Sequence, residues 1–453
     1  MNSARFYFLG CSYENGVARL RYRLDSDGLT LADGAQAPPF SQVFEERVRF
    51  PGAPAQLAPE REAGVAAALK LLHWIAGVSY YKCAPGEVVL EDGPLDAATA
   101  DLLEAVYSHG LAEFAHQNQL QLNVQFPRAA RPLAAPVSVA NLPRRALVPI
   151  GGGKDSLVSI EALKRCSEPC AAVWIGNSEL IRACASATGL PLLNIARELS
   201  PALFELNARG ALNGHIPVTA INSAILVLAA LVYGYDSVVF SNEASADIAT
   251  LHGAHGAVNH QWSKSWAFEQ AFAELVRTRV ASDLHYFSLL RPYSELAITR
   301  KFASLSGYDT LFSSCNRNFR ILGDKPSARW CGQCPKCHFV FLALAPFMSK
   351  PRLLHIFGRN FLDQLDLAAK FDALLEWGGA HKPFECVGEA RESRAAFYAL
   401  SQRADWQEDA LIVRFAKEIF PRLSAEVLDL DALSLPQARG LVPLHLRFCV
   451  DQL

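Results

Sequence analysis

The sequence of 453 residues has little net charge and no long hydrophobic run. Its longest apolar run, from Ala224 to Tyr233, is about half of the ~20 residues that a membrane-spanning helix needs. The first residues, MNSARFYFLGCSYENG, lack the basic segment and apolar stretch of a signal peptide. A formal net charge of -2 gives no overall attraction to nucleic acids or anionic membranes. We therefore expect a cytoplasmic protein with no nucleic-acid or membrane partner, whose oligomeric state the sequence leaves unknown.

Cysteine is present, but not in the pattern of a disulfide framework. The chain has 11 cysteines, an odd number, and no secretory signal, which favours reduced thiols and a metal site. Four of them lie between residues 315 and 337. The other seven are scattered, and we expect them to be packing residues: Cys11, Cys83, Cys166, Cys170, Cys184, Cys386 and Cys449.

The length of the chain predicts two or three domains, because one hydrophobic core rarely serves so many residues. Residues 1–50 have the alternation of strands, and 61–78 and 97–118 have the apolar spacing of helices. The stretch 126–145 is rich in Pro, Ala and Arg and has no periodicity, which is typical of a linker. We expect an N-terminal α+β domain, a central domain and a helical C-terminal region, at residues 1–140, 146–348 and 349–453.

From Ala146 onward, short apolar strands alternate with helices. The strands are expected at 146–150, 170–177, 190–199 and 236–243, with helices between them at 155–166, 178–189 and 217–235. Such βαβ alternation predicts a parallel sheet covered by helices on both faces. The predicted fold class is therefore α/β: a doubly wound parallel sheet with a β-rich N-terminal region and a helical C-terminal region.

A glycine turn, Gly151-Gly152-Gly153, separates the first of these strands from its helix. Glycine permits a tight turn and lets an anion approach the backbone, and the helix N-terminus adds unpaired N–H donors. Lys154 would supply a positive charge, Ser156 a hydroxyl donor, and Asp155 a carboxylate suited to N-capping or to Mg²⁺. The expected ligand is a phosphate chain bound at the carboxyl edge of the sheet.

The six residues Gly151 to Ser156 resemble the PP-loop of the ATP pyrophosphatase superfamily, SGGxDS, with Gly151 in place of the first serine. The resemblance implies ATP bound by Gly151, Gly152, Gly153, Lys154, Asp155 and Ser156. It also implies a PP-loop/HUP-like fold, and cleavage of ATP between the α and β phosphates with adenylation of an oxygen of the substrate. Residues 146–348 would then form the ATP-binding domain.

Cys315, Cys331, Cys334 and Cys337 have the spacing of metal ligands. Thiolates two residues apart can hold one tetrahedral ion from a tight turn, and an upstream thiolate completes the shell. Four sulfur ligands with no open position predict a structural Zn²⁺ site, with an iron–sulfur cluster as the alternative. His338 could replace one sulfur, but we expect it to face the next helix.

Polar side chains are dense between these two motifs. SNEASAD ends a predicted strand, where substrate chemistry gathers, and supplies Glu243 and Asp247 as catalytic candidates. The following loop supplies three histidines, of which His252 and His255 are further acid–base candidates. The candidates for substrate binding are His260, Lys264 and Arg291.

The glycine turn, SNEASA, VNHQWSKSWAFE, LLRPYSEL and CGQCPKC together resemble the UDP-N-acetyl-α-D-muramoyl-L-alanyl-L-glutamate epimerase (MurL) family. That resemblance implies an ATP- and Mg²⁺-dependent enzyme of peptidoglycan precursor synthesis. It would invert the terminal L-glutamate of a small-molecule substrate, UDP-MurNAc-L-Ala-L-Glu, through an acyl-adenylate and release AMP and diphosphate.

Two other functions remain open on the sequence. The cysteine pattern also resembles 7-cyano-7-deazaguanine synthase, a PP-loop ligase that would deliver ammonia to the same kind of adenylate. The second is a zinc-stabilised nucleic-acid-binding module built around CGQCPKC and neighbouring basic residues, among them Arg317, Arg320 and Lys336. The near-neutral net charge and the intact glycine turn speak against this module.

Overall fold

The computed structural model describes residues 4–27, 29–30, 36–81, 85–130, 137–253, 256–320, 324–423 and 428–453. Its largest element is a nine-stranded sheet in the order β13-β10-β7-β8-β9-β5-β2-β1-β6. The strands of this sheet are β1 Arg5–Glu14, β2 Val17–Ser26, β5 Phe40–Arg49, β6 Glu87–Leu90, β7 Ala146–Pro149, β8 Cys170–Ile175, β9 Leu192–Glu198, β10 Ser237–Phe240 and β13 His285–Ser288. Two further pairs are β3 Leu29–Thr30 with β4 Gln36–Ala37, and β11 Leu251–Gly253 with β12 Gly256–Val258.

Five of the nine strands, β13-β10-β7-β8-β9, are parallel to one another. The chain leaves β7 in one direction to form β8 and β9, then returns to the other side of β7 to form β10 and β13. The strand order therefore reverses between β7 and β10. In open α/β sheets, ligands bind at the carboxyl ends of the strands at such a reversal. The glycine turn directly follows β7 and so lies at this point.

The N-terminal strands continue the same sheet. β5 pairs antiparallel with β9 over Arg47–Arg49, and a buried ion pair strengthens this junction, with 2.7 Å between Arg197 Nε and Glu46 Oε1. The Tyr80 hydroxyl also donates to Glu46 Oε2, at 2.9 Å. The three-part division of the chain stays a prediction, but the sheet itself runs without a break across its first boundary.

Fifteen α-helices lie within the described residues, several of them joined or extended by short 3-10 or π turns. They are α1 Pro59–Ala76, α2 Ala97–Ser108, α3 Ala112–Gln117, α4 Lys154–Arg165, α5 Glu179–Ala187, α6 Pro201–Ala208, α7 Val218–Tyr233, α8 Trp266–Leu275, α9 Glu295–Ala303, α10 Pro335–Leu344, α11 Lys350–Phe357, α12 Ala368–Leu375, α13 Ala390–Ser401, α14 Ala410–Arg414 and α15 Leu430–Leu433.

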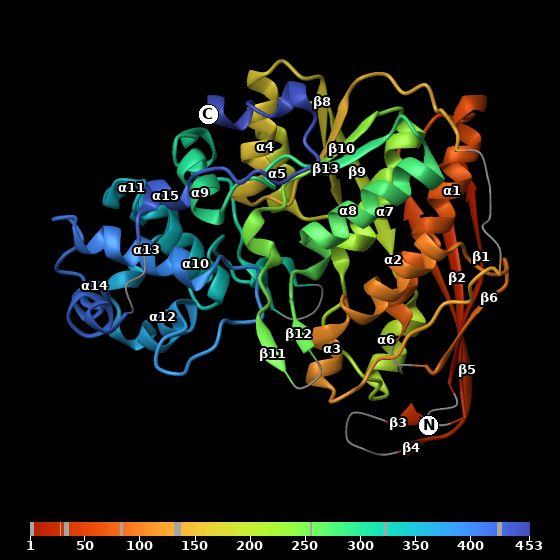
Figure 1. Ribbon diagram of the computed structural model, residues 1–453, viewed down its shortest axis with the longest axis horizontal. Coiled ribbons are helices and arrows are strands. Elements are labelled where there is room, and N and C mark those ends of the chain that lie inside the picture. Colours follow the sequence, from red (N-terminus) through yellow and green to blue (C-terminus); the bar gives the residue numbers. More distant parts are fainter. Residues whose placement is uncertain are drawn as a thin grey trace.

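The sheet separates two hydrophobic cores (Figure 1). Successive side chains of a strand point to opposite faces, and β7 shows this directly. Leu147 lies in the core formed with α1, α7 and α8, whereas Ala146 and Val148 lie in the core formed with α4, α9 and the C-terminal helices. Helices therefore cover both faces of the parallel strands, which confirms the predicted doubly wound α/β fold. In Figure 1 the C-terminal helices α10 to α15 form the end of the molecule opposite the N-terminal strands.

One helical stretch, Pro59–Tyr80, is long and apolar enough to cross a membrane by length and composition, among the residues that the structure describes. However, 72% of its most apolar window is buried within the protein. Its apolar side chains pack against α7 and β1, and the core helix of a folded domain has this same character.

Candidate active site

A cavity of about 370 Å³ lies at the carboxyl ends of β7 and β10. Its wall includes the last residue of each strand and the two residues after it: Pro149, Ile150, Gly151, Phe240, Ser241 and Asn242. Two buried donors in this wall, Asn242 Nδ2 and Trp174 Nε1, have no hydrogen-bond partner among the described residues. Because buried polar groups are nearly always paired, unpaired donors in a cavity wall indicate a site for a polar ligand.

The glycine turn forms one side of this cavity. Gly151 and Gly153 line it, together with Asp155 and Ser156 from the first turn of α4. Gly152 has a φ of 77°, in the left-handed region, and its carbonyl accepts a 2.9 Å hydrogen bond from the Ser313 N–H. The turn therefore has the strand–turn–helix geometry that was predicted for a phosphate-binding loop.

Replacing Gly152 with alanine is expected to destabilise the protein by about 1–2 kcal/mol, the cost of a left-handed conformation for a residue with a Cβ atom. Gly151→Ala is the matched control, because no atom lies within 4 Å of the Cβ that it would add. Chemical denaturation of both variants measures the difference. Equal denaturation midpoints for the two would contradict the prediction.

Lys154 does not line the cavity. Its side chain is 1% exposed, and its ammonium group contacts the carboxylates of Asp155 and Glu295. Although burial opposes the charge, these two carboxylates raise the pKa of Lys154 above its usual range. We propose that Lys154 positions Asp155 from behind the loop while Asp155 itself faces the ligand.

Two buried carboxyl groups behind the cavity have pKa values shifted in opposite directions. Burial and the charge of Glu295 raise the pKa of Glu243 above its usual value. Glu295 is buried as well, but Lys154 and Lys336 lower its pKa to about 2. Neighbouring acids whose pKa values are driven apart in this way can serve as a proton donor and a fixed charge. Glu243, whose pKa is raised, is therefore the group of this pair that is more easily protonated.

Two other candidate site residues, Arg291 and Asp247, form hydrogen bonds and ion pairs with other residues of the protein. Arg291 is fully buried, and its guanidinium donates to Glu269 Oε2 at 2.8 Å and to the Glu243 carbonyl at 2.7 Å. Asp247 accepts from the Trp266 N–H at 2.6 Å and pairs with Arg439. Neither residue lines the cavity, and we propose that both position the loops around it.

The remaining candidate residues are the three histidines and Lys264. His252 lies in β11, where its backbone pairs with Ala257, but its side chain is outside the described part of the structure, as is the whole of His255. His260 Nδ1 lies 2.5 Å from Glu113 Oε2. Lys264 lines the cavity.

The structure adds two cavity residues that the sequence did not reveal, Lys336 and Cys386. Cys386 was expected to be a packing residue, and this is wrong, because its Sγ lies 3.5 Å from Lys264 Nζ in the cavity wall. Lys336 donates to the backbone carbonyl of Cys386. No local pattern marks Cys386 in the sequence. Lys336 stands within CGQCPKC, between two candidate metal ligands. This position could have marked it as a candidate site residue.

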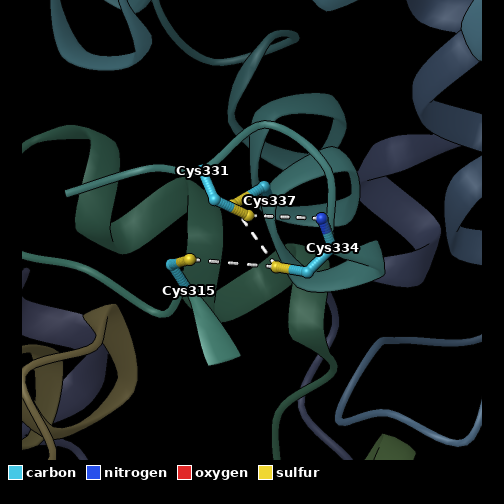
Figure 2. Close-up of side chains that lie close together, drawn as sticks. All are labelled: Cys315, Cys331, Cys334 and Cys337. Carbon is cyan, nitrogen blue, oxygen red and sulfur yellow. Dashed lines mark hydrogen bonds between the residues drawn. The ribbon is translucent and has the colours of Figure 1, made fainter. Parts of the chain in front are cut away.

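The four closely spaced cysteines converge on one point (Figure 2). The Sγ atoms of Cys331 and Cys337 are 3.8 Å apart, those of Cys315 and Cys334 4.0 Å, and those of Cys334 and Cys337 3.4 Å. A tetrahedral zinc site with ~2.3 Å Zn–S bonds separates its sulfurs by about 3.8 Å. The cluster therefore fits a single Zn²⁺, whereas the several atoms of an iron–sulfur cluster would hold the sulfurs farther apart.

The ligand loop has the hydrogen bonds that orient such a site. The N–H groups of Gln333 and Cys334 donate to Cys331 Sγ at 3.3 and 3.4 Å. His338 does not join the cluster. As expected, it faces the following helices, with Nε2 3.1 Å from the Gly332 carbonyl oxygen and its ring against Phe361.

The cysteine cluster is connected to the cavity wall by two segments. Ser313 and Ser314, which precede Cys315, line the cavity beside the glycine turn. Lys336 stands between Cys334 and Cys337 on the first turn of α10 and reaches the cavity from there. A metal ion at the cluster would thus fix both segments at once.

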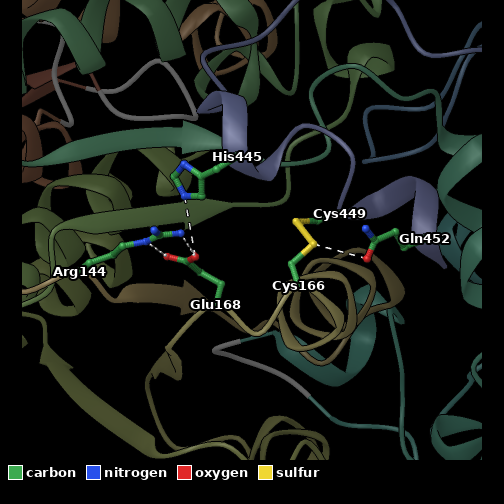
Figure 3. The surroundings of a disulfide bond; sticks show 6 residues. All are labelled: Arg144, Cys166, Glu168, His445, Cys449 and Gln452. Carbon is green, nitrogen blue, oxygen red and sulfur yellow. Dashed lines mark hydrogen bonds and ion pairs between the residues drawn. A yellow bond between two sulfur atoms is a disulfide. The ribbon is translucent and has the colours of Figure 1, made fainter.

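The expectation of reduced thiols outside the cluster is wrong for Cys166 and Cys449, which form a disulfide across 283 residues of sequence (Figure 3). Cys166 caps the C-terminal end of α4, and Cys449 belongs to the last turns of the chain. Beside them, Arg144 pairs with Glu168 at 2.6 Å. The C-terminal tail is therefore tied covalently to the helix that begins at the glycine turn.

The fold and the cavity define an α/β protein with a cavity at the strand-order reversal. The family model of the MurL N-terminal domain matches residues 1–289, and that of the MurL C-terminal domain matches residues 311–428. The chain therefore belongs to the MurL family, as its motifs predicted.

Curated relatives agree with this assignment. A UDP-N-acetyl-alpha-D-muramoyl-L-alanyl-L-glutamate epimerase from Xanthomonas oryzae pv. oryzae is 54% identical over 443 residues, which cover 97% of this chain and 95% of the relative. Proteins of the same name from Salinispora tropica and from a Micromonospora strain are 40% identical over 423 residues and 42% identical over 409 residues. These alignments cover 92% and 88% of this chain, and 91% and 90% of the relatives.

Proposed function

We propose that this protein is an ATP-dependent epimerase that converts UDP-MurNAc-L-Ala-L-Glu to UDP-MurNAc-L-Ala-D-Glu, with release of AMP and diphosphate. One observation carries the proposal: the glycine turn, two ammonium groups and a thiol line the same cavity. The names of the curated relatives, at up to 54% identity over nearly the whole chain, support the choice of substrate.

The chemistry explains why an epimerase would use ATP. The α-proton of a free carboxylate is hard to remove, because the resulting enolate adds charge to an anion. Attack of the carboxylate on the α-phosphorus of ATP expels diphosphate and gives an acyl-adenylate, in which the acyl carbonyl no longer carries the carboxylate charge. Its α-proton can then be removed from one face and returned to the other. Water finally adds at the acyl carbon and expels AMP.

We assign the nucleotide to the side of the cavity formed by the glycine turn. The main chain at Gly151 and Gly153 and the Ser156 hydroxyl would bind phosphate oxygens. Asp155 would hold Mg²⁺, which neutralises charge on the departing diphosphate. Trp174 and Asn242 would give the nucleotide their unpaired donors.

The substrate would occupy the opposite side. The ammonium groups of Lys264 and Lys336 can pair with the γ-carboxylate or with phosphate oxygens. Glu243, whose pKa is raised by burial, is our candidate for the acid that returns a proton to the α-carbon. His252 and His255 remain candidates for the same acid–base work.

The test is incubation with UDP-MurNAc-L-Ala-L-Glu, ATP and Mg²⁺, followed by measurement of AMP and of D-glutamate after acid hydrolysis. We expect both products, with no requirement for ammonia. Asp155→Asn is expected to slow AMP release by about 10²- to 10³-fold, the usual cost of removing one electrostatic contact to a transition state. Glu179→Gln is the matched control, since Glu179 is 77% exposed at the start of α5.

Two results would contradict the proposal. AMP release that needs ammonia and leaves the glutamate unchanged would favour the ligase alternative. An Asp155→Asn variant with wild-type AMP release would remove the glycine turn from the reaction.

A further inference from the structure

A chain of three polar side chains leads from the cavity wall into the protein. Cys386 lines the cavity, and the His260 imidazole is close enough to its thiol to favour the thiolate. His260 Nδ1 lies 2.5 Å from a carboxylate oxygen of Glu113. Glu113 is 6% exposed. The three residues come from α3, from the loop before α8, and from the segment before α13, so only the fold brings them together.

The charges around Cys386 favour its thiolate. Burial opposes ionisation, but the Lys264 ammonium, the hydrogen bond from His260 and the charge of Lys336 lower the pKa of Cys386 to about 6. Glu385 is the acidic group close to the thiol, and burial raises the pKa of this carboxyl to about 7.

His260 is itself held in the charged form. Although burial opposes its charge, hydrogen bonds to Cys386 and Glu113 raise the pKa of His260 to about 9. By contrast, burial raises the pKa values of Cys11, Cys170 and Cys184 to about 11. Cys386 therefore stands apart from these three free cysteines, because two ammonium groups and the His260 imidazole outweigh the effect of its burial.

We propose that Cys386 is the base that removes the α-proton of the activated glutamyl residue, with His260 and Glu113 as positioning residues. This inference rests on the proposed function. Its geometric basis is that Cys386 lines the cavity that Asp155 and Ser156 also line. Lys336 fixes the segment, because it donates to the carbonyl of Cys386.

The Cys386 thiolate takes the α-proton and becomes a thiol, and the electron pair of the C–H bond moves into the acyl group to give an enolate. The Lys264 ammonium, 3.5 Å from the sulfur, stabilises the negative charge as it moves from sulfur to the enolate. An acid on the opposite side, for which Glu243 behind the cavity wall is the candidate, then returns a proton to the other face. Afterwards the thiol loses its proton to water, and Glu243 regains one.

A thiolate suits this step because general bases work best when their pKa lies near the operating pH. Cys386→Ala is expected to lower the rate of glutamate inversion by about 10²- to 10⁴-fold, the usual contribution of a positioned base. Incorporation of solvent deuterium at the α-carbon should fall by the same factor. Diphosphate release in a single turnover should persist, because adenylation does not need the thiol.

Cys170→Ala is the matched control. Cys170 is also half-buried, but it lies at the start of β8 and does not line the cavity. Deuterium incorporation by Cys386→Ala at the wild-type rate would overturn the inference. A wild-type protein that releases neither diphosphate nor AMP would instead contradict the proposed function, so the two failures are distinguishable.

Alkylation of the unmodified protein gives a test that does not depend on a variant folding. Iodoacetamide should label Cys386 faster than Cys170 at pH 7, as measured by peptide mass spectrometry, and the rate should rise with pH through about 6, where the thiolate forms. His260→Asn should move that rise to higher pH, since the thiolate loses a hydrogen bond. Labelling of Cys386 no faster than that of Cys170 would overturn the inference.

Metal analysis checks the role of His260. Ligand atoms of Glu113, His215 and His260 lie within 4.8 Å of one another, a spacing that an ion could also occupy. We expect one zinc per chain, held by the four cysteines and retained by His260→Asn. A second equivalent that is lost in His260→Asn would overturn the assignment of His260 as a positioning residue.

Discussion

Replacing Cys337 with serine is expected to release the metal ion and to disorder the segment between residues 315 and 337. A serine hydroxyl is a poor substitute for a thiolate, and the three remaining sulfurs leave the tetrahedral shell open. Structural zinc contributes about 10–16 kcal/mol to folding in isolated zinc-finger peptides. Even partial loss of that contribution is large beside the ~5–15 kcal/mol that stabilises a typical protein.

Loss of the metal ion should also disturb the residues that line the cavity. The Ser313 N–H donates to the carbonyl of Gly152, and Lys336 lies between two of the ligands, so disorder here removes support from both sides of the site. We expect AMP release to fall together with the zinc content.

Elemental analysis and limited proteolysis of Cys337→Ser measure the effect. The matched control is Cys11→Ser, a half-buried free cysteine on β1, far from the cluster in sequence. A variant that keeps one zinc per chain, or that resists protease as well as the wild type does, would contradict the structural role of the site.

The second large effect is expected at the buried ion pair behind the glycine turn. Lys154 and Glu295 are each 1% exposed. Breaking a buried pair by removing one partner costs about 3–5 kcal/mol, because the other charge is left without compensation. Lys154→Met should therefore lower the free energy of unfolding by roughly that amount. Lys336, 3.6 Å from the second oxygen of Glu295, offsets part of the loss.

The double variant Lys154→Met/Glu295→Met is the informative control. Replacing both partners of a buried pair by apolar groups of similar volume is often neutral or stabilising. We expect the double variant to recover most of the stability that the single variant loses. A double variant as unstable as Lys154→Met, or a single variant as stable as the wild type, would contradict this account.

The same pair predicts a pH dependence. The folded protein holds the pKa of Glu295 at about 2, below its usual value of 4.5. The stabilisation from its ionised form is therefore fully present above that usual value and is lost as the pH falls toward 2. The difference in unfolding free energy between the wild type and Lys154→Met should accordingly be largest near neutral pH and should shrink in acid.

Local patterns in the sequence were enough to predict the doubly wound sheet. The apolar run of α7 and the strands β7, β8 and β10 each satisfy their own periodicity, and the glycine turn needs only the strand before it and the helix after it. The same holds for CGQCPKC, whose spacing brings three thiols together within one turn. These features depend on residues that are close in the chain. Composition and spacing are therefore enough to predict them.

The join between β5 and β9 was not predicted, because it depends on a register between strands that are far apart in the sequence. The same applies to the disulfide between Cys166 and Cys449. Each of these cysteines is an isolated residue in its own segment, and only the path of the C-terminal tail places the two sulfurs together.

By itself, then, the sequence determined which segments are strands and helices and the family, and it predicted which turn would bind a phosphate chain and which cysteines could hold a metal ion. Tertiary structure alone decided which charges face one another: Lys154 with Glu295, and Cys386 with Lys264, His260 and, beyond it, Glu113. The reason is physical. A pKa depends on burial and on groups a few ångströms away, and those neighbours are set by the packing of distant segments.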